Sequence, residues 1–387
     1  MGLFPVMGNS PAGMRLERMR RSPNYKADRF ENLVPTEVTV RGISFFKMLR
    51  EFRNRPADTA PAGRIPAVKT DLRALPAEGA WIVWFGHSSY LLKIGGMTIL
   101  VDPVFSGNAS PVSFFAKAFA GTEVYGVEEM PEIDVLLLTH DHYDHLDYKT
   151  VKRLAPGVKR VCTSLGVGAH LEAWGVAAGK IVELDWWESW EFGGAGGGGG
   201  GRLGGAGGLT LMAAPARHFS GRSFKRGGTL WSSFVLKGRG YSLYLGGDSG
   251  YEGHFREIGE RCGPFDLAIL ECGQYGKNWP YIHMLPEQTV QAALDLKAAA
   301  LMPVHWGKFT LALHAWDEPV RRLMAAAEVA GASAAAAGGV PSGARATAGV
   351  PSGAAANGLA VVTPMIGQAF RVGGPYPAER WWEGVRD

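Results

Sequence analysis

The chain has 387 residues, a formal net charge of +4, 46% hydrophobic residues and 20% charged residues. This composition is that of a globular protein and excludes a disordered or fibrous chain. Residues 1–73 hold 14 of the 40 Lys/Arg residues and 7 of the 36 Asp/Glu residues. The rest of the chain therefore has 26 basic and 29 acidic residues and is net acidic. Because phosphate backbones bind to basic faces, we expect no nucleic-acid partner.

Cysteine usage and the lack of long apolar runs indicate the cellular compartment in which the protein is expected. The three cysteines, Cys162, Cys262 and Cys272, form no Cys-X-X-Cys pair, so neither a disulfide framework nor a thiolate zinc site is expected. The first ten residues do not resemble a signal peptide, and no stretch is apolar enough to span a bilayer. We therefore expect a soluble, cytoplasmic protein.

The chain divides into an arm and a body. Residues 1–75 are rich in Arg and Pro, which predicts a basic N-terminal arm packing on the body, and residues 76–387 are expected to form one domain. Short aliphatic and aromatic runs predict strands at Trp81–Phe85, Thr98–Val101, Val135–Thr139, Leu209–Ala213, Trp231–Leu236, Tyr241–Leu245, Leu267–Glu271 and Leu359–Thr363. Helical patterns occur at Tyr148–Leu154, Pro286–Ala299 and Glu318–Ala330. Together they indicate an α+β fold in which two sheets pack face to face with helices outside.

Two low-complexity segments interrupt the body. Residues 193–208 contain 12 glycines in 16 residues, but no Gly-Lys-Ser/Thr follows, so a phosphate-binding loop is not supported. We interpret the run as a flexible hairpin insertion. Residues 331–358 are rich in Ala, Gly and Ser and are predicted to be a disordered loop before the final strand.

The strand predicted at Val135–Thr139 runs into a loop that is rich in metal-ligating side chains. Three histidines and two aspartates lie within six residues: His140, Asp141, His142, Asp144 and His145. Imidazole and carboxylate bind divalent transition metals, and zinc takes about four such ligands. One loop cannot enclose a metal, so further ligands must come from elsewhere. The candidates are His218, Asp248 and His305, because each follows a β-rich run and open sites are built at strand ends.

These residues carry a family resemblance. The segment Thr139–His145 resembles the His-X-His-X-Asp-His signature of the metallo-β-lactamase superfamily, and His218, Asp248 and His305 follow in its order. Within the superfamily, Trp84–Ser89 and Val304–Phe309 resemble blocks of the N-acyl-phosphatidylethanolamine-hydrolysing phospholipase D group. The resemblance implies a four-layer αββα sandwich.

The resemblance also implies a site for two divalent ions, Zn²⁺ first and Mn²⁺ or Fe²⁺ as alternatives. One ion would be held by His140, His142 and His218, the other by Asp144, His145 and His305, with Asp248 bridging them. Two such ions lower the pKa of a shared water enough to supply hydroxide near neutral pH. The expected catalytic residues are Asp144, Asp248 and His283.

Other residues keep two interpretations. His283 either protonates a leaving group, contacts a phosphate, or only occupies a loop. Asp102 either supports a ligand histidine or shapes the turn before Pro103, and His87 is ambiguous. Five tryptophans could face lipid, but aromatic residues at such spacing more often pack in the core: Trp186, Trp187, Trp190, Trp381 and Trp382.

The resemblance predicts a phosphodiesterase that acts on a glycerophospholipid such as N-acyl-phosphatidylethanolamine, by attack of a metal-bridging hydroxide. A lactonase of the same superfamily and a metal-binding protein without turnover are the alternatives. Nuclease action is disfavoured by the acidic body. Peripheral contact with a membrane surface is a separate hypothesis, prompted by basic residues of the arm: Arg15, Arg18, Arg20, Arg21, Lys26 and Arg29.

Overall fold

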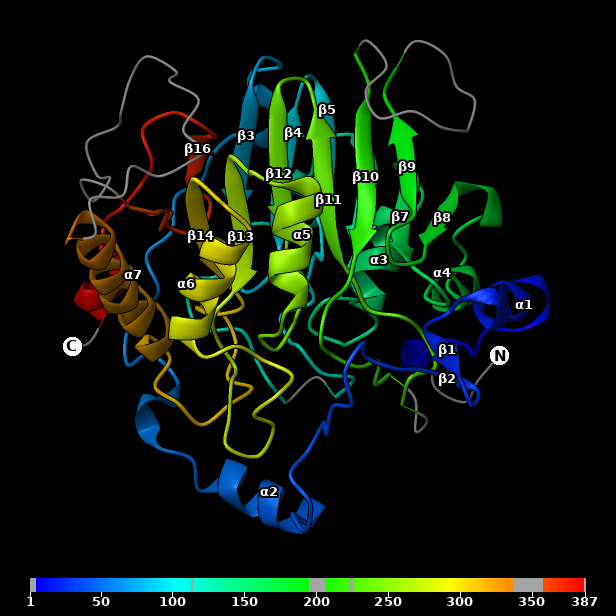
Figure 1. Ribbon diagram of the computed structural model, residues 1–387, viewed down its shortest axis with the longest axis horizontal. Coiled ribbons are helices and arrows are strands. Elements are labelled where there is room, and N and C mark those ends of the chain that lie inside the picture. Colours follow the sequence, from blue (N-terminus) through cyan, green and yellow to red (C-terminus); the bar gives the residue numbers. More distant parts are fainter. Residues whose placement is uncertain (1–4, 113–114, 195–206, 223–225, 337–357, 386–387) are drawn as a thin grey trace.

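The computed structural model describes residues 5–112, 115–194, 207–222, 226–336 and 358–385 (Figure 1). Within these ranges two seven-stranded sheets face each other. The first has the order β16-β3-β4-β5-β6-β7-β8, and its strands are β3 (Ala80–Trp84), β4 (Tyr90–Ile94), β5 (Met97–Val101), β6 (Ile133–Leu138), β7 (Val158–Ser164), β8 (Ile181–Leu184) and β16 (Ala369–Arg371). The second has the order β15-β14-β13-β12-β11-β10-β9, with β9 (Ser189–Phe192), β10 (Leu209–Ala214), β11 (Ser233–Gly238), β12 (Tyr241–Leu245), β13 (Leu267–Glu271), β14 (Ala300–Val304) and β15 (Ala360–Val361).

Helices cover the outer faces of both sheets. Against the first sheet lie α3 (Tyr148–Leu154) and α4 (Gly168–Ala173), and against the second lie α5 (His254–Cys262), α6 (Pro286–Asp295) and α7 (Glu318–Ala336) (Figure 1). The predicted α+β sandwich is therefore confirmed.

Strand β6 shows how the layers are held together. Its alternate residues Val135 and Leu137 belong to the apolar cluster between the two sheets, while Leu136 and Leu138 pack in the cluster beneath α3 and α4. All four are essentially inaccessible to solvent. Because successive side chains of a strand point to opposite faces, a continuous apolar run is what a strand buried on both sides requires. This burial places the polar loop after Leu138 at the edge of the sandwich.

Several predicted boundaries were wrong by a few residues. Strand β11 begins at Ser233 and not at Trp231, because Ser232 donates its N–H to the carbonyl of Thr139 in the opposite layer. Helix α6 ends at Asp295, and the left-handed backbone of Lys297 (φ 58°) prevents its continuation. Helix α7 extends through residues 331–336, which were predicted to be loop, since the Ala-rich sequence favours helix. Residues 337–357 of that predicted loop lie outside the described residues.

The glycine-rich segment joins two paired strands. β9 and β10 are antiparallel, and Phe192 faces Leu209 at the end of the pair. This connection is the one expected of a hairpin insertion, although residues 195–206 lie outside the described residues.

The N-terminal 75 residues contain more regular structure than the sequence indicated. They include α1 (Gly13–Arg21), the short hairpin of β1 (Tyr25–Lys26) and β2 (Arg29–Phe30), and α2 (Phe45–Arg53). Arg15 forms ion pairs with Glu183 and Glu172, and Arg18 pairs with Glu188. Helix α1 is thus tied electrostatically to the body, next to α4 and β8 (Figure 1).

The tryptophans pack mainly in the interior. Trp186, Trp381 and Trp382 are buried, and Trp187 and Trp190 are half-buried. Trp381 stacks on Trp306, with ring centroids 5.2 Å apart. The core interpretation of these residues therefore holds. No helix among the described residues is long and apolar enough to cross a membrane.

Candidate metal centre

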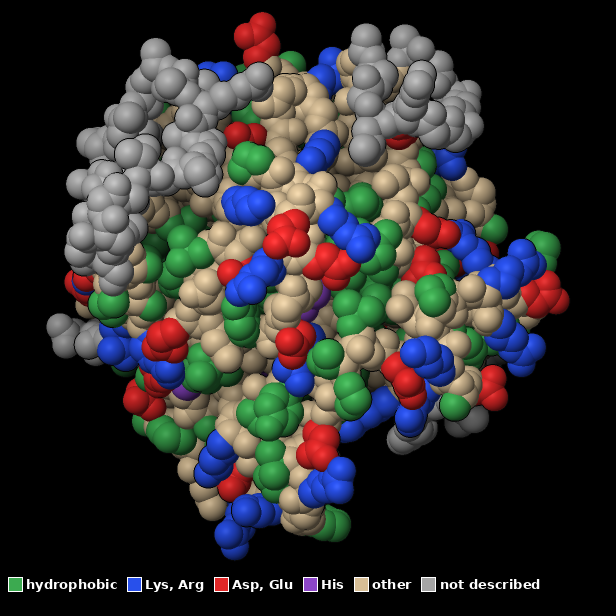
Figure 2. Space-filling view, in the orientation of Figure 1, with side chains coloured by type: hydrophobic (Ala, Val, Ile, Leu, Met, Phe, Trp, Pro, Cys, Tyr) green, Lys and Arg blue, Asp and Glu red, His purple; other side chains and the backbone are tan. Residues whose placement is uncertain are grey.

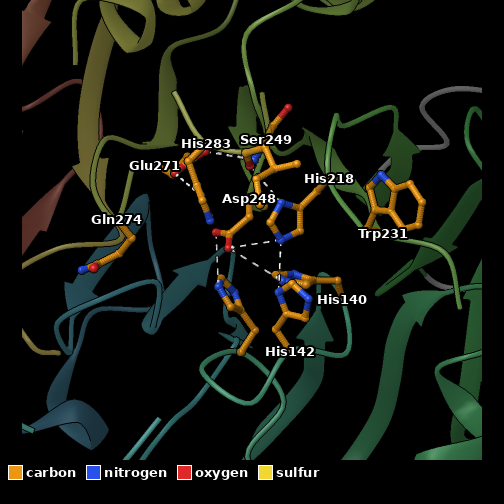
Figure 3. Close-up of polar contacts among 12 residues, drawn as sticks. His140, His142, His218, Trp231, Asp248, Ser249, Glu271, Gln274 and His283 are labelled. Carbon is orange, nitrogen blue, oxygen red and sulfur yellow. Dashed lines mark hydrogen bonds and ion pairs between the residues drawn. The ribbon is translucent and has the colours of Figure 1, made fainter. Parts of the chain in front are cut away.

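One cluster of ligand atoms forms where both sheets end at the same edge of the sandwich. The loop after β6 carries His140 and His142, His218 follows β10, and Asp248 follows β12 (Figure 3). One nitrogen or oxygen atom from each of these four residues lies within 4.8 Å of the others. Side chains from opposite sheets are therefore brought into a single potential metal site.

A second cluster lies beside the first. His87, Asp144, His145 and His305 place one ligand atom each within 4.8 Å of one another. His87 (φ 53°) and His305 (φ 68°) adopt left-handed backbone conformations at the ends of β3 and β14. Such conformations are costly for residues other than glycine and concentrate at functional sites. They turn both imidazoles toward Asp144, which lies 2.9 Å from His87 Nε2 and 3.3 Å from His305 Nε2.

Asp248 lies between the two clusters. Its Oδ2 atom is 3.8 Å from His140 Nε2 and 3.7 Å from His218 Nε2 in the first cluster. In the second cluster, Oδ2 lies 3.2 Å from His305 Nε2, and Oδ1 lies 3.2 Å from His145 Nε2. The carboxylate is thus positioned to bridge two ions.

The unsatisfied atoms at this centre test whether metal ions fit it. His140 Nε2, His145 Nε2 and Asp248 Oδ1 are buried and make no hydrogen bond within the described part of the chain. Buried polar atoms without partners are rare, because each costs about 1–3 kcal/mol. Imidazole nitrogens and carboxylate oxygens are suitable ligands for Zn²⁺, Mn²⁺ or Fe²⁺. The residues present therefore fit two divalent ions.

Supporting hydrogen bonds orient the histidines. Asp102 accepts from His145 Nδ1 at 2.7 Å and from the hydroxyl of Thr139 at 2.6 Å, in agreement with the supporting role considered for it. His218 Nδ1 donates to the carbonyl of Ile282 at 2.9 Å. With the proton on Nδ1, the Nε2 atom of each ring is left to face the centre, which is the usual arrangement around ligand histidines.

The electrostatics keep most of these groups in a form that binds metal. Burial and the neighbouring His145 hold the pKa of His140 well below its usual range, and burial with His142 does the same to the pKa of His218. Burial would raise the pKa of Asp248, but His145 and His305 outweigh it and hold that pKa well below its ordinary value. Conversely, burial would lower the pKa of His145, yet Asp248 and Asp144 raise it to about 10. Burial would likewise lower the pKa of His305, but Asp248 and Asp144 hold it well above its usual range, so both histidines would give up a proton on binding a metal.

Residue His283 lies beside the centre. Its Nδ1 is 3.0 Å from Glu271 Oε2, and its ring stacks against that of His305 with centroids 5.1 Å apart. It lines a hollow of about 240 Å³, together with His142, Asp144 and Gln274. His283 is thus within the site and is not simply a loop residue.

Sequence reasoning left one contributor undecided and missed two. His87 lies in the Trp84–Ser89 block that carries part of the resemblance, but its role was ambiguous. Glu271 is a buried carboxylate that ends a predicted strand, and that position was its only signal. Asn32 had no signal: its side chain donates to the carbonyl of His218 at 2.8 Å and accepts from the N–H of His218 at 3.0 Å. Through Asn32 the N-terminal segment contacts the centre directly.

The remaining histidines have structural partners. His170 lies 3.6 Å from Asp141 and accepts from the backbone N–H of Asn9, while His254 lies 3.2 Å from the hydroxyl of Ser249. His314 Nε2 accepts from the N–H of Gln274. These contacts agree with the structural interpretation of lone histidines.

Comparisons with known proteins show the family and the fold of this chain. A family profile described as "Beta-lactamase superfamily domain" matches residues 97–306. An uncharacterised protein of Mycobacterium tuberculosis is 40% identical over 333 residues, covering 84% of this chain and 85% of that protein. The mitochondrial N-acyl-phosphatidylethanolamine-hydrolyzing phospholipase D of Saccharomyces cerevisiae is 30% identical over 264 residues, covering 64% of this chain and 52% of that protein. A possible metal-dependent hydrolase from Veillonella parvula shares the fold, with a TM-score of 0.51, 13% identity, and coverage of 76% of this chain and 99% of that one.

Proposed function

Because this chain belongs to the metallo-β-lactamase superfamily of hydrolases, we propose that it is a dinuclear, metal-dependent phosphodiesterase acting on a glycerophospholipid. The observation that carries the proposal is Asp248, whose carboxylate lies between two groups of ligand atoms. Similarity to phospholipases D that hydrolyse N-acyl-phosphatidylethanolamine in yeast and Caenorhabditis elegans supports the substrate class.

The proposed ligands divide into two sets. His140, His142 and His218 would hold one ion, and Asp144, His145 and His305 the other, with Asp248 shared. Two bound divalent ions, for which zinc is the first choice, would lower the pKa of a water molecule and stabilise the charge that develops on a phosphoryl oxygen.

Other residues of the hollow would act on the substrate. His283 Nδ1 faces Glu271, so its Nε2 atom is available to the leaving group or to a phosphate oxygen. Arg226 lines the same hollow and stacks over Phe219, with its guanidinium carbon 5.2 Å from the ring centroid. A cation there would attract a phosphodiester anion.

A chromogenic phosphodiester tests the proposal. We expect the purified protein to hydrolyse it, to lose activity on chelation, and to regain activity with Zn²⁺ or Mn²⁺. His140→Ala and Asp248→Ala should abolish turnover while circular dichroism shows a folded protein. Asp266→Ala is the matched control, because this exposed carboxylate accepts from the N–H of Ser242 near the start of β12 and belongs to neither cluster of candidate ligands.

Two results would contradict this function. Full activity of either ligand variant would refute the metal mechanism. Hydrolysis of lactones without hydrolysis of any phosphodiester, by protein shown to hold two metal ions, would instead favour a lactonase.

A further inference from the structure

We propose that helix α2 and the neighbouring segment around Phe115 form a docking surface for membranes that contain anionic phospholipid. The surface lies beside the metal-site hollow. The proposal does not depend on the hydrolytic function, since membrane binding can be measured without turnover.

The first observation is the exposure of large apolar side chains on α2. Phe46 is 79% exposed and Leu49 is 50% exposed, and Phe115 next to them is 39% exposed. Phe46 and Leu49 are three residues apart and share one face of the helix. Phe52, one turn after Leu49, packs on Phe115 with ring centroids 5.0 Å apart and so joins α2 to the segment around Phe115. Clustered apolar side chains that stay largely exposed mark a binding surface.

The second observation is the charge around these side chains. Arg50 and Arg53 follow Phe46 and Leu49 by four residues each, so they lie on the same face, and Lys117 joins them at the rim of the adjoining groove. The acidic residue of α2, Glu51, faces the body instead and accepts a hydrogen bond from Asn278 at 2.9 Å. Lys and Arg side chains gather at the lower tip of the molecule in Figure 2, where Figure 1 places α2.

This pattern selects a lipid surface as the partner. An interfacial helix combines an exposed apolar face with cationic side chains, which anionic headgroups attract. The basic residues of α1 fit less well, because Arg15 and Arg18 are already paired with glutamates. We therefore favour α2 over the basic residues of α1 as the membrane contact.

The position of α2 connects docking to the metal centre. Met48 of α2 lines the 240 Å³ hollow that contains His142, Asp144 and His283. Phe46 and Leu49 line a neighbouring groove of about 640 Å³. A membrane seated on α2 would therefore present lipid at the edge of the metal-site hollow.

Vesicle co-sedimentation of the full-length protein tests the proposal. We expect binding to vesicles of phosphatidylcholine and phosphatidylglycerol (about 7:3), weaker binding to phosphatidylcholine alone, and weaker binding as salt is added. Phe46→Asp with Leu49→Asp should weaken binding at least about tenfold. Arg50→Ala with Arg53→Ala should weaken it about 30-fold.

Two control variants show whether vesicle binding depends on this surface. Met14→Asp alters an apolar residue of α1 that is 86% exposed, and it should bind vesicles as the wild type does. His140→Ala should also bind normally, so that failure of hydrolysis and failure of docking are distinguishable. Thermal unfolding of each variant verifies that it is folded.

Three outcomes would overturn the proposal. They are absence of wild-type binding to anionic vesicles, equal loss of binding in Met14→Asp, and unchanged binding in both α2 double variants. Sedimentation of a dimer that the α2 variants convert to a monomer, without vesicle binding, would assign the surface to a second copy of this chain.

Discussion

Asn32→Ala tests whether the N-terminal segment positions a proposed metal ligand. The Asn32 side chain makes two hydrogen bonds to the buried backbone of His218, at 2.8 and 3.0 Å. Each such bond contributes about 1 kcal/mol net, so the variant should lose about 2 kcal/mol. If the whole loss falls on the orientation of His218, metal affinity should drop about 30-fold. Asn32 Oδ1 also accepts from the indole N–H of Trp231 at 3.2 Å, but Trp231 keeps a hydrogen bond in the variant because the same N–H donates to the carbonyl of Ala216 at 3.0 Å.

Competition with a chromophoric zinc chelator measures the affinity, and urea unfolding of metal-free protein measures the stability. Asn32→Asp should be at least as harmful, since it keeps the acceptor but places a carboxylate oxygen against the carbonyl of His218. Asn24→Ala is the matched control: Asn24 lies in the same segment but donates to Asp185, away from the centre. Wild-type zinc affinity in Asn32→Ala, or an equal loss in Asn24→Ala, would refute the reasoning.

Three further variants probe other parts of the site and its support. Asp102→Asn should reduce zinc affinity about 10–100-fold, because the amide replaces the carboxylate that orients His145; an unchanged dissociation constant would exclude this role. Burial lowers the pKa of the Lys308 ammonium group to about 8. The unfolded chain therefore holds this proton more tightly than the folded protein does, and the free energy of unfolding should rise by about 2 kcal/mol from about pH 7.5 to about pH 9.5. Lys308→Met should remove this increment in urea unfolding, and the same slope in both proteins would count against it. Gly250→Ala should cost about 3 kcal/mol or more, because a Cβ would lie 1.8 Å from the carbonyl oxygen of Tyr281; a melting temperature equal to that of the wild type would show that the loop yields freely.

The sequence was most informative where the chemistry is local. His140–His145 follow one another directly after an apolar strand, so both the strand and the ligand loop could be predicted. His218, Asp248 and His305 could be proposed because each ends a β-rich run, but their meeting depends on which strands pair. No local pattern reports that pairing.

The residues that escaped prediction act across long separations in the chain. Asn32 lies 186 residues from His218 and reaches its backbone, which a single sequence cannot reveal. His87 needs the left-handed turn after β3 to face Asp144. Helix α2 was missed although Phe45, Met48, Leu49 and Phe52 have the i, i+3, i+4, i+7 spacing of an amphipathic helix, because the Arg- and Pro-rich segment around them was interpreted as an irregular arm.

The direction of β10 gives the sandwich two unlike ends. Its Ala214 end leads to His218 and the metal centre, while Leu209, at its start, pairs with Phe192 beside the glycine-rich connection. Six residues of strand span about 20 Å. Chain length can therefore change at the far end during evolution without disturbing the ligands, and a reporter inserted by an engineer has the same freedom. The end of the sandwich that accepts added sequence and the end that holds the proposed ligands are thus one strand length apart.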